Sequence, residues 1–202
     1  MSKSHLIDKV NSDALYELKE SQTKFIQEEV WMLTYGASFQ RAYAYVKDAS
    51  EKTKEEFKFM TSGYIDNMLS QYRHGSVSEE EHVENIKRVS EYSSNFSEIF
   101  IGGRINFGIA QKMVNLYLKY QWCLGNIAEP PHFPVDRIIQ EKLIKSAREN
   151  KIAPLQLKPW TQFKDESHYL KVINLAREVA KVDWYVENLT PAQAELKLFE
   201  RR

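Results

Sequence analysis

The segment from Phe107 to Leu124 constrains the fold more than any other part of the sequence. Its apolar side chains recur nearly all round a helical cylinder, which is typical of a helix buried in the centre of a domain. Asn106 can cap the start of this helix, and Gly125 can end it. We therefore expect the rest of the chain to pack around this helix. We also expect its single cysteine, Cys123, to be a small buried side chain.

Most of the remaining sequence also shows the periodicity of amphipathic helices. Such patterns run from Ser12-Asp13 to Gly36, which interrupts or ends the first helix, and then over 39–46, 57–69, 78–89, 135–148 and 165–182. Ser78 before three glutamates, and Thr190 before Pro191 and Gln193, are signatures of helix starts. No run alternates long enough to predict a strand. The sequence therefore predicts an all-α fold, a compact helical domain of about eight to ten helices.

The length and composition limit the number of domains and the location. The chain has 202 residues, of which 43% are hydrophobic. One sizeable core is feasible at this length, so we expect a single helical domain over 1–202; the alternative is two lobes, 1–100 and 101–202, with a cleft between them. No apolar run could span a bilayer, and the first five residues lack the apolar stretch of a signal peptide. We expect a cytoplasmic protein without membrane association, and the sequence leaves its oligomeric state open.

The charges are unevenly distributed, although 28 basic and 28 acidic residues balance overall. Residues 1–100 carry a net charge of −5 (12 basic, 17 acidic), residues 101–164 carry +6 (10 basic, 4 acidic) and residues 165–202 carry −1 (6 basic, 7 acidic). No carboxylate occurs from Ile101 to Ala128. This basic middle third permits an anionic partner such as nucleic acid, although a basic segment is more often a solvated surface.

Several chemistries have no support in the sequence. It contains no phosphate-binding loop, no dinucleotide-binding fingerprint and no cluster of cysteines and histidines. The five histidines are scattered without metal-ligand spacing: His5, His74, His82, His132 and His168. We therefore expect neither a metal site nor a cofactor.

One lysine and one aspartate occupy positions that disfavour a free charge. Lys112 lies early in the most apolar helix, and Asp136 follows a proline-rich loop 24 residues later, at the start of another helix. A lysine that loses part of its hydration would more often be the nucleophilic neutral amine. Two structural alternatives remain open: an ion pair between the two side chains, or a Lys112 that extends to solvent along a stripe with Asn115 and Lys119.

The same positions carry a resemblance to a known family. The string GIAQK at 108–112, the apolar helix after it, and PVD at 134–136 resemble the core of the helix-hairpin-helix superfamily of DNA glycosylases. In that family a Gly-Val-Gly-x-Lys hairpin leads into a helix, and a Val-Asp pair follows about twenty residues later. The chain looks closest to the lysine-bearing, 8-oxoguanine-type branch, which includes enzymes with a degenerate hairpin. The resemblance covers roughly residues 100–145.

The resemblance implies a role for each matching residue. Lys112 would attack C1′ of the damaged nucleotide to form a Schiff base, with strand cleavage, and Asp136 would stabilise the positive charge that develops on the sugar. Backbone amides around Gly108 would bind a DNA phosphate. Further phosphate contacts would come from Arg104, Lys119 and Arg137. The aromatic candidates for stacking the flipped base are Trp31, Tyr35, Phe39, Trp122, Phe133 and Trp160.

The sequence departs from the family pattern at three points. Ala110 replaces the second glycine of the hairpin, which alters the turn that binds phosphate. Arg137 and Ile138 stand where the family has a small or polar residue followed by histidine. The loop before Pro134 lengthens the spacing between the lysine and the aspartate.

Two hypotheses of different classes follow. The first is a small all-α DNA glycosylase with lyase activity, which excises an oxidised or modified base from duplex DNA through Lys112 and Asp136. The second is a non-catalytic helical interaction protein, for example a phage or host-defence factor, that binds nucleic acid or a protein through the basic middle third.

Overall fold

The computed structural model describes residues 3–73, 75 and 77–198 of the chain. In these residues the chain forms seven α-helices, α1 (Lys3–Phe39), α2 (Glu51–Arg73), α3 (Glu79–Tyr92), α4 (Phe107–Cys123), α5 (Arg137–Glu149), α6 (Ser167–Ala180) and α7 (Pro191–Leu198), and two 3-10 helices, η1 (Ser93–Ile99) and η2 (Trp160–Gln162). Within the same ranges there is no strand, only an isolated bridge between Tyr45 and Phe100. The all-α prediction is confirmed, with slightly fewer helices than expected.

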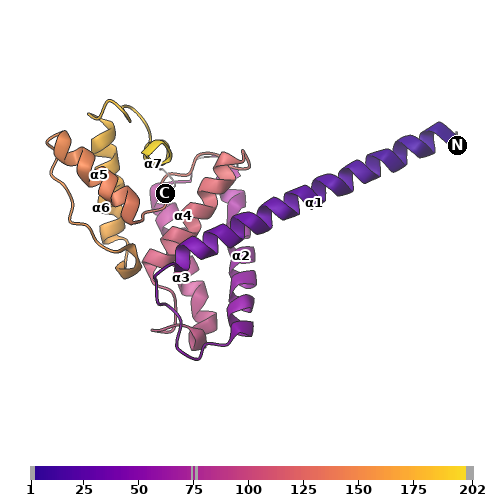
Figure 1. Ribbon diagram of the computed structural model, residues 1–202, viewed down its shortest axis with the longest axis horizontal. Helices are drawn as coiled ribbons and strands as arrows, with labels where there is room; N and C mark the ends of the chain where they lie inside the picture. The colour runs from indigo at the N-terminus through magenta and orange to yellow at the C-terminus, as the bar shows by residue number, and fades with distance from the viewer. Residues whose placement is uncertain (1–2, 74, 76, 199–202) are drawn as a thin grey trace.

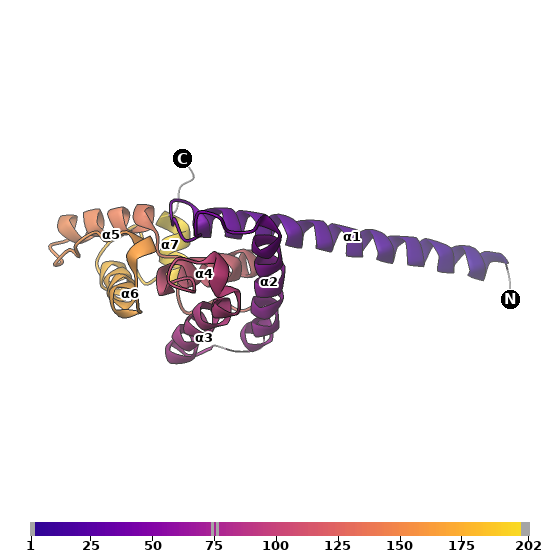
Figure 2. The same cartoon turned by 90° about the horizontal axis from the view of Figure 1, so that it is seen from below.

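The central position of α4 is confirmed. This helix packs against α1, α3 and η2, and the other helices surround it (Figures 1 and 2). Most of its side chains are buried, because an apolar surface on every side needs neighbours on every side. The expectation for Cys123 is wrong: it is exposed, since it is the last residue of α4 and lies beyond the helices that cover the middle.

Local capping signals set three of the helix starts. The hydroxyl of Ser78 accepts a hydrogen bond from the amide of Glu81 at the start of α3. Asn106 accepts one from the Ile109 amide at the start of α4. Before α7, the hydroxyl of Thr190 accepts a hydrogen bond from the Gln193 amide. The side-chain oxygen of Gln193 accepts one in return from the Thr190 amide. These hydrogen bonds satisfy amides that a helix leaves unpaired.

Two local predictions near residue 40 are wrong. α1 continues through Gly36 to Phe39, and residues 40–46 of the predicted helix 39–46 form a loop. Arg41 and Tyr43 have positive φ values of 60° and 47°, which a right-handed helix does not allow. Tyr45 instead pairs with Phe100 and stacks on its ring at 5.3 Å. Contacts with a segment far away in the sequence have therefore overridden the local periodicity.

The first helix projects from the rest of the molecule. α1 has 37 residues, a length of ~55 Å, and only its C-terminal part packs on the domain (Figure 1). Val30, Trp31 and Tyr35 are buried there, whereas every residue from 15 to 26 is exposed. We call the part of α1 from residue 15 to residue 36 the arm.

The remaining helices form two neighbouring groups around one hydrophobic core. α1 to α4 lie on one side, and α5, α6 and α7 contact one another on the other side (Figure 1). α4 follows residue 101 in the sequence but packs with helices from the first hundred residues. Within the described ranges, no helix is both long enough and apolar enough to cross a membrane.

Candidate functional site

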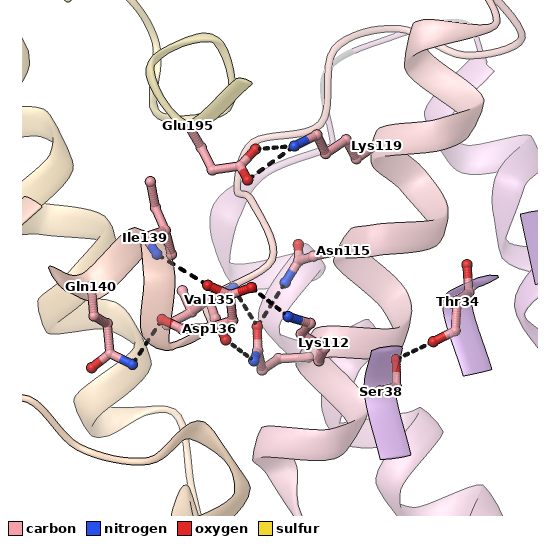
Figure 3. A network of polar contacts seen from close by, with 11 residues as sticks. Thr34, Ser38, Lys112, Asn115, Lys119, Val135, Asp136, Ile139, Gln140 and Glu195 are labelled. Atoms are coloured by element: carbon pink, nitrogen blue, oxygen red, sulfur yellow. Dashed lines mark hydrogen bonds and ion pairs between the residues drawn. The ribbon is translucent and has the colours of Figure 1, made fainter. Parts of the chain in front are cut away.

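The structure brings Lys112 and Asp136 into direct contact (Figure 3). The Nζ atom of Lys112 on α4 lies 2.7 Å from Oδ2 of Asp136. The other carboxylate oxygen, Oδ1, accepts a hydrogen bond of 3.0 Å from the Ile139 amide and so caps α5. One carboxylate therefore fixes both the lysine and the start of the following helix.

The surroundings of this pair are closed. The side chains of Lys112 and Asp136 are only 9% and 18% exposed. The Trp160 ring lies 5.4 Å from the lysine Nζ and covers it on one side. Gln111 donates to the carbonyl oxygen of Val135 and accepts from its amide, which holds the segment before the aspartate against α4. The arrangement is that of an ion pair that ties α4 to α5, one of the two structural alternatives.

A second buried ion pair lies two turns further along α4. Lys119 contacts both carboxylate oxygens of Glu195 on α7, at 3.0 and 2.7 Å (Figure 3). Burial raises the pKa of Glu195, and the neighbouring ammonium of Lys119 opposes that shift. Two cations of the basic middle third are thus engaged inside the molecule and hold the C-terminal helices in place.

The remaining residues expected to contact phosphate differ in their surroundings. The Gly108 amide donates to the carbonyl oxygen of Phe163, so it is already used within the chain. A Cβ atom at Gly108 would lie 1.8 Å from the carbonyl oxygen of Trp160, which explains why glycine is needed. Arg104 is exposed ahead of α4, and the exposed Arg137 pairs with a glutamate one turn later on α5.

The aromatic candidates do not line one pocket with the lysine. Trp160 contacts Lys112 through its ring. Trp31 stacks on the ring of Tyr117 at 3.9 Å, between α1 and α4. The other four are buried or partly buried in the core: Tyr35, Phe39, Trp122 and Phe133.

A chain of buried polar side chains crosses the core, and sequence reasoning missed it. The hydroxyl of Tyr72 lies 2.9 Å from Nδ1 of His82, whose Nε2 lies 2.9 Å from Oδ1 of Asn115. The Asn115 amide reaches the hydroxyl of Tyr169 at 3.0 Å, and that hydroxyl reaches Nδ1 of His132 at 3.0 Å. All five side chains are buried. The available signal was the presence of asparagine in the most apolar helix, where an unpaired amide would be costly.

The hydrogen bonds determine which nitrogens carry protons. Because the Asn115 amide donates to Tyr169, its oxygen must accept a proton from Nε2 of His82. Nδ1 of His82 then accepts from the tyrosine on α2. The Tyr169 hydroxyl donates to Nδ1 of His132, which leaves the proton of His132 on Nε2, 3.6 Å from a carboxylate oxygen of Glu79. Both imidazoles are therefore neutral.

The electrostatics agree with neutral histidines. Burial lowers the pKa of His82 to about 3, and the nearby His132 lowers it further. Burial likewise lowers the pKa of His132 to about 3, with a smaller effect from Arg177. A chain of neutral, hydrogen-bonded groups can specify how four helices pack, although Nε2 of His132 has no hydrogen-bond partner in it. All five side chains are buried, so none is exposed to a substrate.

The arm carries several exposed apolar side chains. Besides Tyr16, six large apolar side chains on it are exposed: Leu15, Leu18, Phe25, Ile26, Met32 and Leu33. At about 100° per residue they fall within an arc of about 120° on one side of the helix. The buried residues Val30, Trp31 and Tyr35 occupy the opposite side, toward the domain. We call the exposed set the apolar face of α1.

A hollow of about 1340 Å³ lies in the corner between the arm and α2. Its apolar lining includes Trp31, Tyr35 and Phe39 from α1 and Phe59 from α2. It opens on the domain side of the arm, so it is separate from most of the apolar face.

In the part of the chain that the structure describes, no group of three or more histidine, cysteine, aspartate or glutamate side chains could hold a metal ion. Comparisons with protein families, curated proteins and solved structures found no match for this chain. The ion pair and α1 are therefore the features from which a function is inferred.

Proposed function

We propose that this chain is a helical protein-interaction module that binds a protein partner through the apolar face of α1. The observation that carries the proposal is the position of Leu18, Phe25 and Ile26, which are exposed on a helix that projects from the domain. Exposed apolar side chains gathered on one face in this way mark interaction sites in soluble proteins.

The energetics of the arm support this function. Most helical stability in proteins comes from packing an amphipathic face rather than from intrinsic propensity. Residues 15–26 of α1 are exposed on all sides and receive little of that support from the domain. A helix of a partner that covered Phe25 and its neighbours would remove their apolar surface from water, at about 25 cal/mol per Å².

This proposal keeps the interaction class expected from the sequence but moves the surface. The basic middle third was expected to bind the partner, yet Lys112 and Lys119 are engaged in buried ion pairs. The exposed apolar side chains lie in the first third of the chain instead. Other cations of the middle third, such as Arg104 and Arg148, are exposed, but the apolar face of α1 is the surface that we propose for the partner.

Photo-crosslinking in cells tests the proposal. A photoreactive benzoylphenylalanine at position 25 should give covalent adducts with protein on irradiation, and the same residue at position 184 serves as the control. Trp184 is also exposed, at 83%, but lies in the C-terminal half of the chain. Adducts at position 25 and not at position 184 support the function. No adduct at position 25, or equal adducts at both, contradicts it.

A second candidate function remains the DNA glycosylase with lyase activity. One observation favours it: the lysine and the aspartate that the resemblance singles out meet at 2.7 Å, at the start of a helix. Lys112 could attack C1′ of a damaged nucleotide only after the enclosed ion pair opens, since the carboxylate of Asp136 and the ring of Trp160 now cover its Nζ.

Borohydride trapping tests this second candidate. The protein is incubated with duplex DNA containing an abasic site or 8-oxoguanine, reduced, and examined on a denaturing gel. A covalent complex that Lys112→Gln removes and the surface variant Arg137→Gln retains would support a Schiff base on Lys112. Folded protein that gives no covalent complex with the abasic duplex rules the lyase out.

A further inference from the structure

We infer that the partner bound by α1 is a second copy of this chain, with the two arms side by side and antiparallel. The inference rests on the proposed function, because it names the occupant of the apolar face of α1. Three properties of the arm support it: access, a self-complementary sequence, and the placement of charge.

Access comes from the position of the apolar face on α1. The face is centred about 170° around the helix from the side that packs on the domain, at about 100° per residue. Leu33 on this face is exposed, whereas Thr34 and Tyr35 point into the domain and are buried. A second helix can therefore lie along the face without meeting the body of its own or the other domain.

The sequence of the arm is complementary to itself in one antiparallel register. When Phe25 lies opposite Ile26 of the second copy, Leu18 lies opposite the second copy's Leu33. Each contact occurs twice, because a two-fold axis relates the copies. The centre and both ends of the shared seam are then apolar.

Two polar residues interrupt the apolar face, and the same register pairs them. Gln22 and Glu29 lie between the two rows of apolar side chains on the helix surface. In the antiparallel register Gln22 lies opposite Glu29 of the second copy, where its amide can donate to the carboxylate. A parallel pair would instead place the two Glu29 carboxylates against each other, which is unfavourable.

The flanking charges also fit the antiparallel register. No charged residue of the arm lies opposite a residue of the same charge. Gly36 comes opposite Leu15 of the second copy, and a Cβ built at Gly36 would meet nothing within 4 Å, which leaves room for that leucine.

The first experiment measures the mass of the full chain in solution by light scattering across a concentration series. The unmodified protein should be a dimer, and Phe25→Glu should raise the dissociation constant by about 100-fold or more, because it places two carboxylates at the two-fold axis. Phe59→Glu is the matched control, since Phe59 is a similarly exposed phenylalanine on α2. Circular dichroism establishes that each variant is folded.

The second experiment tests the register in a Cys123→Ser background, which removes the single natural cysteine. A short bismaleimide should join Ile26→Cys to itself and should join a mixture of Leu18→Cys and Leu33→Cys. It should not join Leu15→Cys to itself, because those positions are ~30 Å apart in the antiparallel pair. Self-crosslinking of Leu15→Cys would show a parallel pair and overturn the inference.

The outcomes separate this inference from the proposed function. A monomeric protein at all concentrations, or a dimer that Phe25→Glu leaves intact, overturns the inference. If the photo-crosslinking at position 25 then still gives adducts heavier or lighter than twice the chain mass, the interaction function stands with a different protein as partner. If it gives no adduct, both fail.

Discussion

α4 and α1 differ in what surrounds the side chains that do not suit their position. In α4, charged and polar residues occur in an apolar helix, and Lys112, Asn115 and Lys119 each have a partner from another element. In α1, apolar residues such as Phe25 occur on a projecting helix and remain exposed. The polar residues of α4 are satisfied within the chain and hold the domain together. The apolar residues of α1 are not covered within the chain, which is why we propose this side of the molecule as the binding surface.

The sharpest test of the packing of the turn at Trp160 on α4 is Gly108→Ala. Its Cβ would lie 1.8 Å from the carbonyl oxygen of Trp160 and 3.2 Å from Cβ of Phe163, so α4 and the turn over it must separate. We expect a loss of more than about 4 kcal/mol in the free energy of unfolding, measured by urea denaturation. A loss below about 1 kcal/mol would show that this turn is not packed on α4 as described.

Removing Asp136 tests whether the ion pair is structural. Asp136→Ala leaves the ammonium of Lys112 without its partner and uncaps α5, so unfolding should become easier by about 3–5 kcal/mol. The matched control is Arg137→Ala, which removes an exposed pair and should cost less than about 0.5 kcal/mol. Similar values for the two variants would contradict a structural role for the buried pair.

Acid should lower the free energy of unfolding through His82 and His132. Their folded-state pKa values are about 3, below the usual 6.5, so the unfolded chain binds more protons between these values. Stability is therefore complete above pH 6.5 and falls as the pH drops toward 3, by about 2 to 3 kcal/mol in total at pH 5.5.

The check on this pH dependence is chemical denaturation from pH 7.5 to 4.5. His132→Gln should be less stable at neutral pH but should lose about half of the dependence. An unchanged dependence in that variant would assign the effect to other groups.

The smallest expected effects belong to the arm. Gly36→Ala should stabilise the chain by up to about 1 kcal/mol, since Gly36 lies within α1 and an added methyl group meets nothing. Thermal unfolding at a low protein concentration measures this effect without a contribution from association. A destabilisation would mean that α1 does not continue through Gly36 in the isolated chain.

Phe25→Glu complements that test, because Phe25 is 60% exposed and its replacement should change the unfolding free energy of the monomer by less than about 0.5 kcal/mol. Its effect should appear in association instead. A large loss of monomer stability would show that Phe25 packs within its own chain.

The fold could be predicted from the sequence wherever local signals acted alone. The apolar surface of residues 107–124 predicted the central helix, and Ser78, Asn106 and Thr190 predicted helix starts that the structure confirms. The helix expected over 39–46 failed because Tyr45 found a distant partner in Phe100. Periodicity describes a preference of the segment, and tertiary contacts can outweigh it.

The candidate sites were only partly accessible from the sequence. It drew attention to Lys112 and Asp136, but not to whether they meet in an open cleft or in an enclosed pair. It missed the contact between Lys119 and Glu195, which are 76 residues apart. It also missed the path through His82 and His132, because no spacing rule connects histidines that meet only in the folded chain.

The amino-acid pattern alone predicts a helical chain with residues 107–124 at its centre, since a pattern repeated every three to four residues leaves few other solutions. Which face of each helix is covered depends on contacts in the folded chain. The periodicity of the apolar residues of α1 is typical of a helix that packs on a core. In the fold, however, the helix extends past the domain and leaves these side chains in solvent. Periodicity defines a face along a helix, but neighbours distant in sequence decide whether that face is covered.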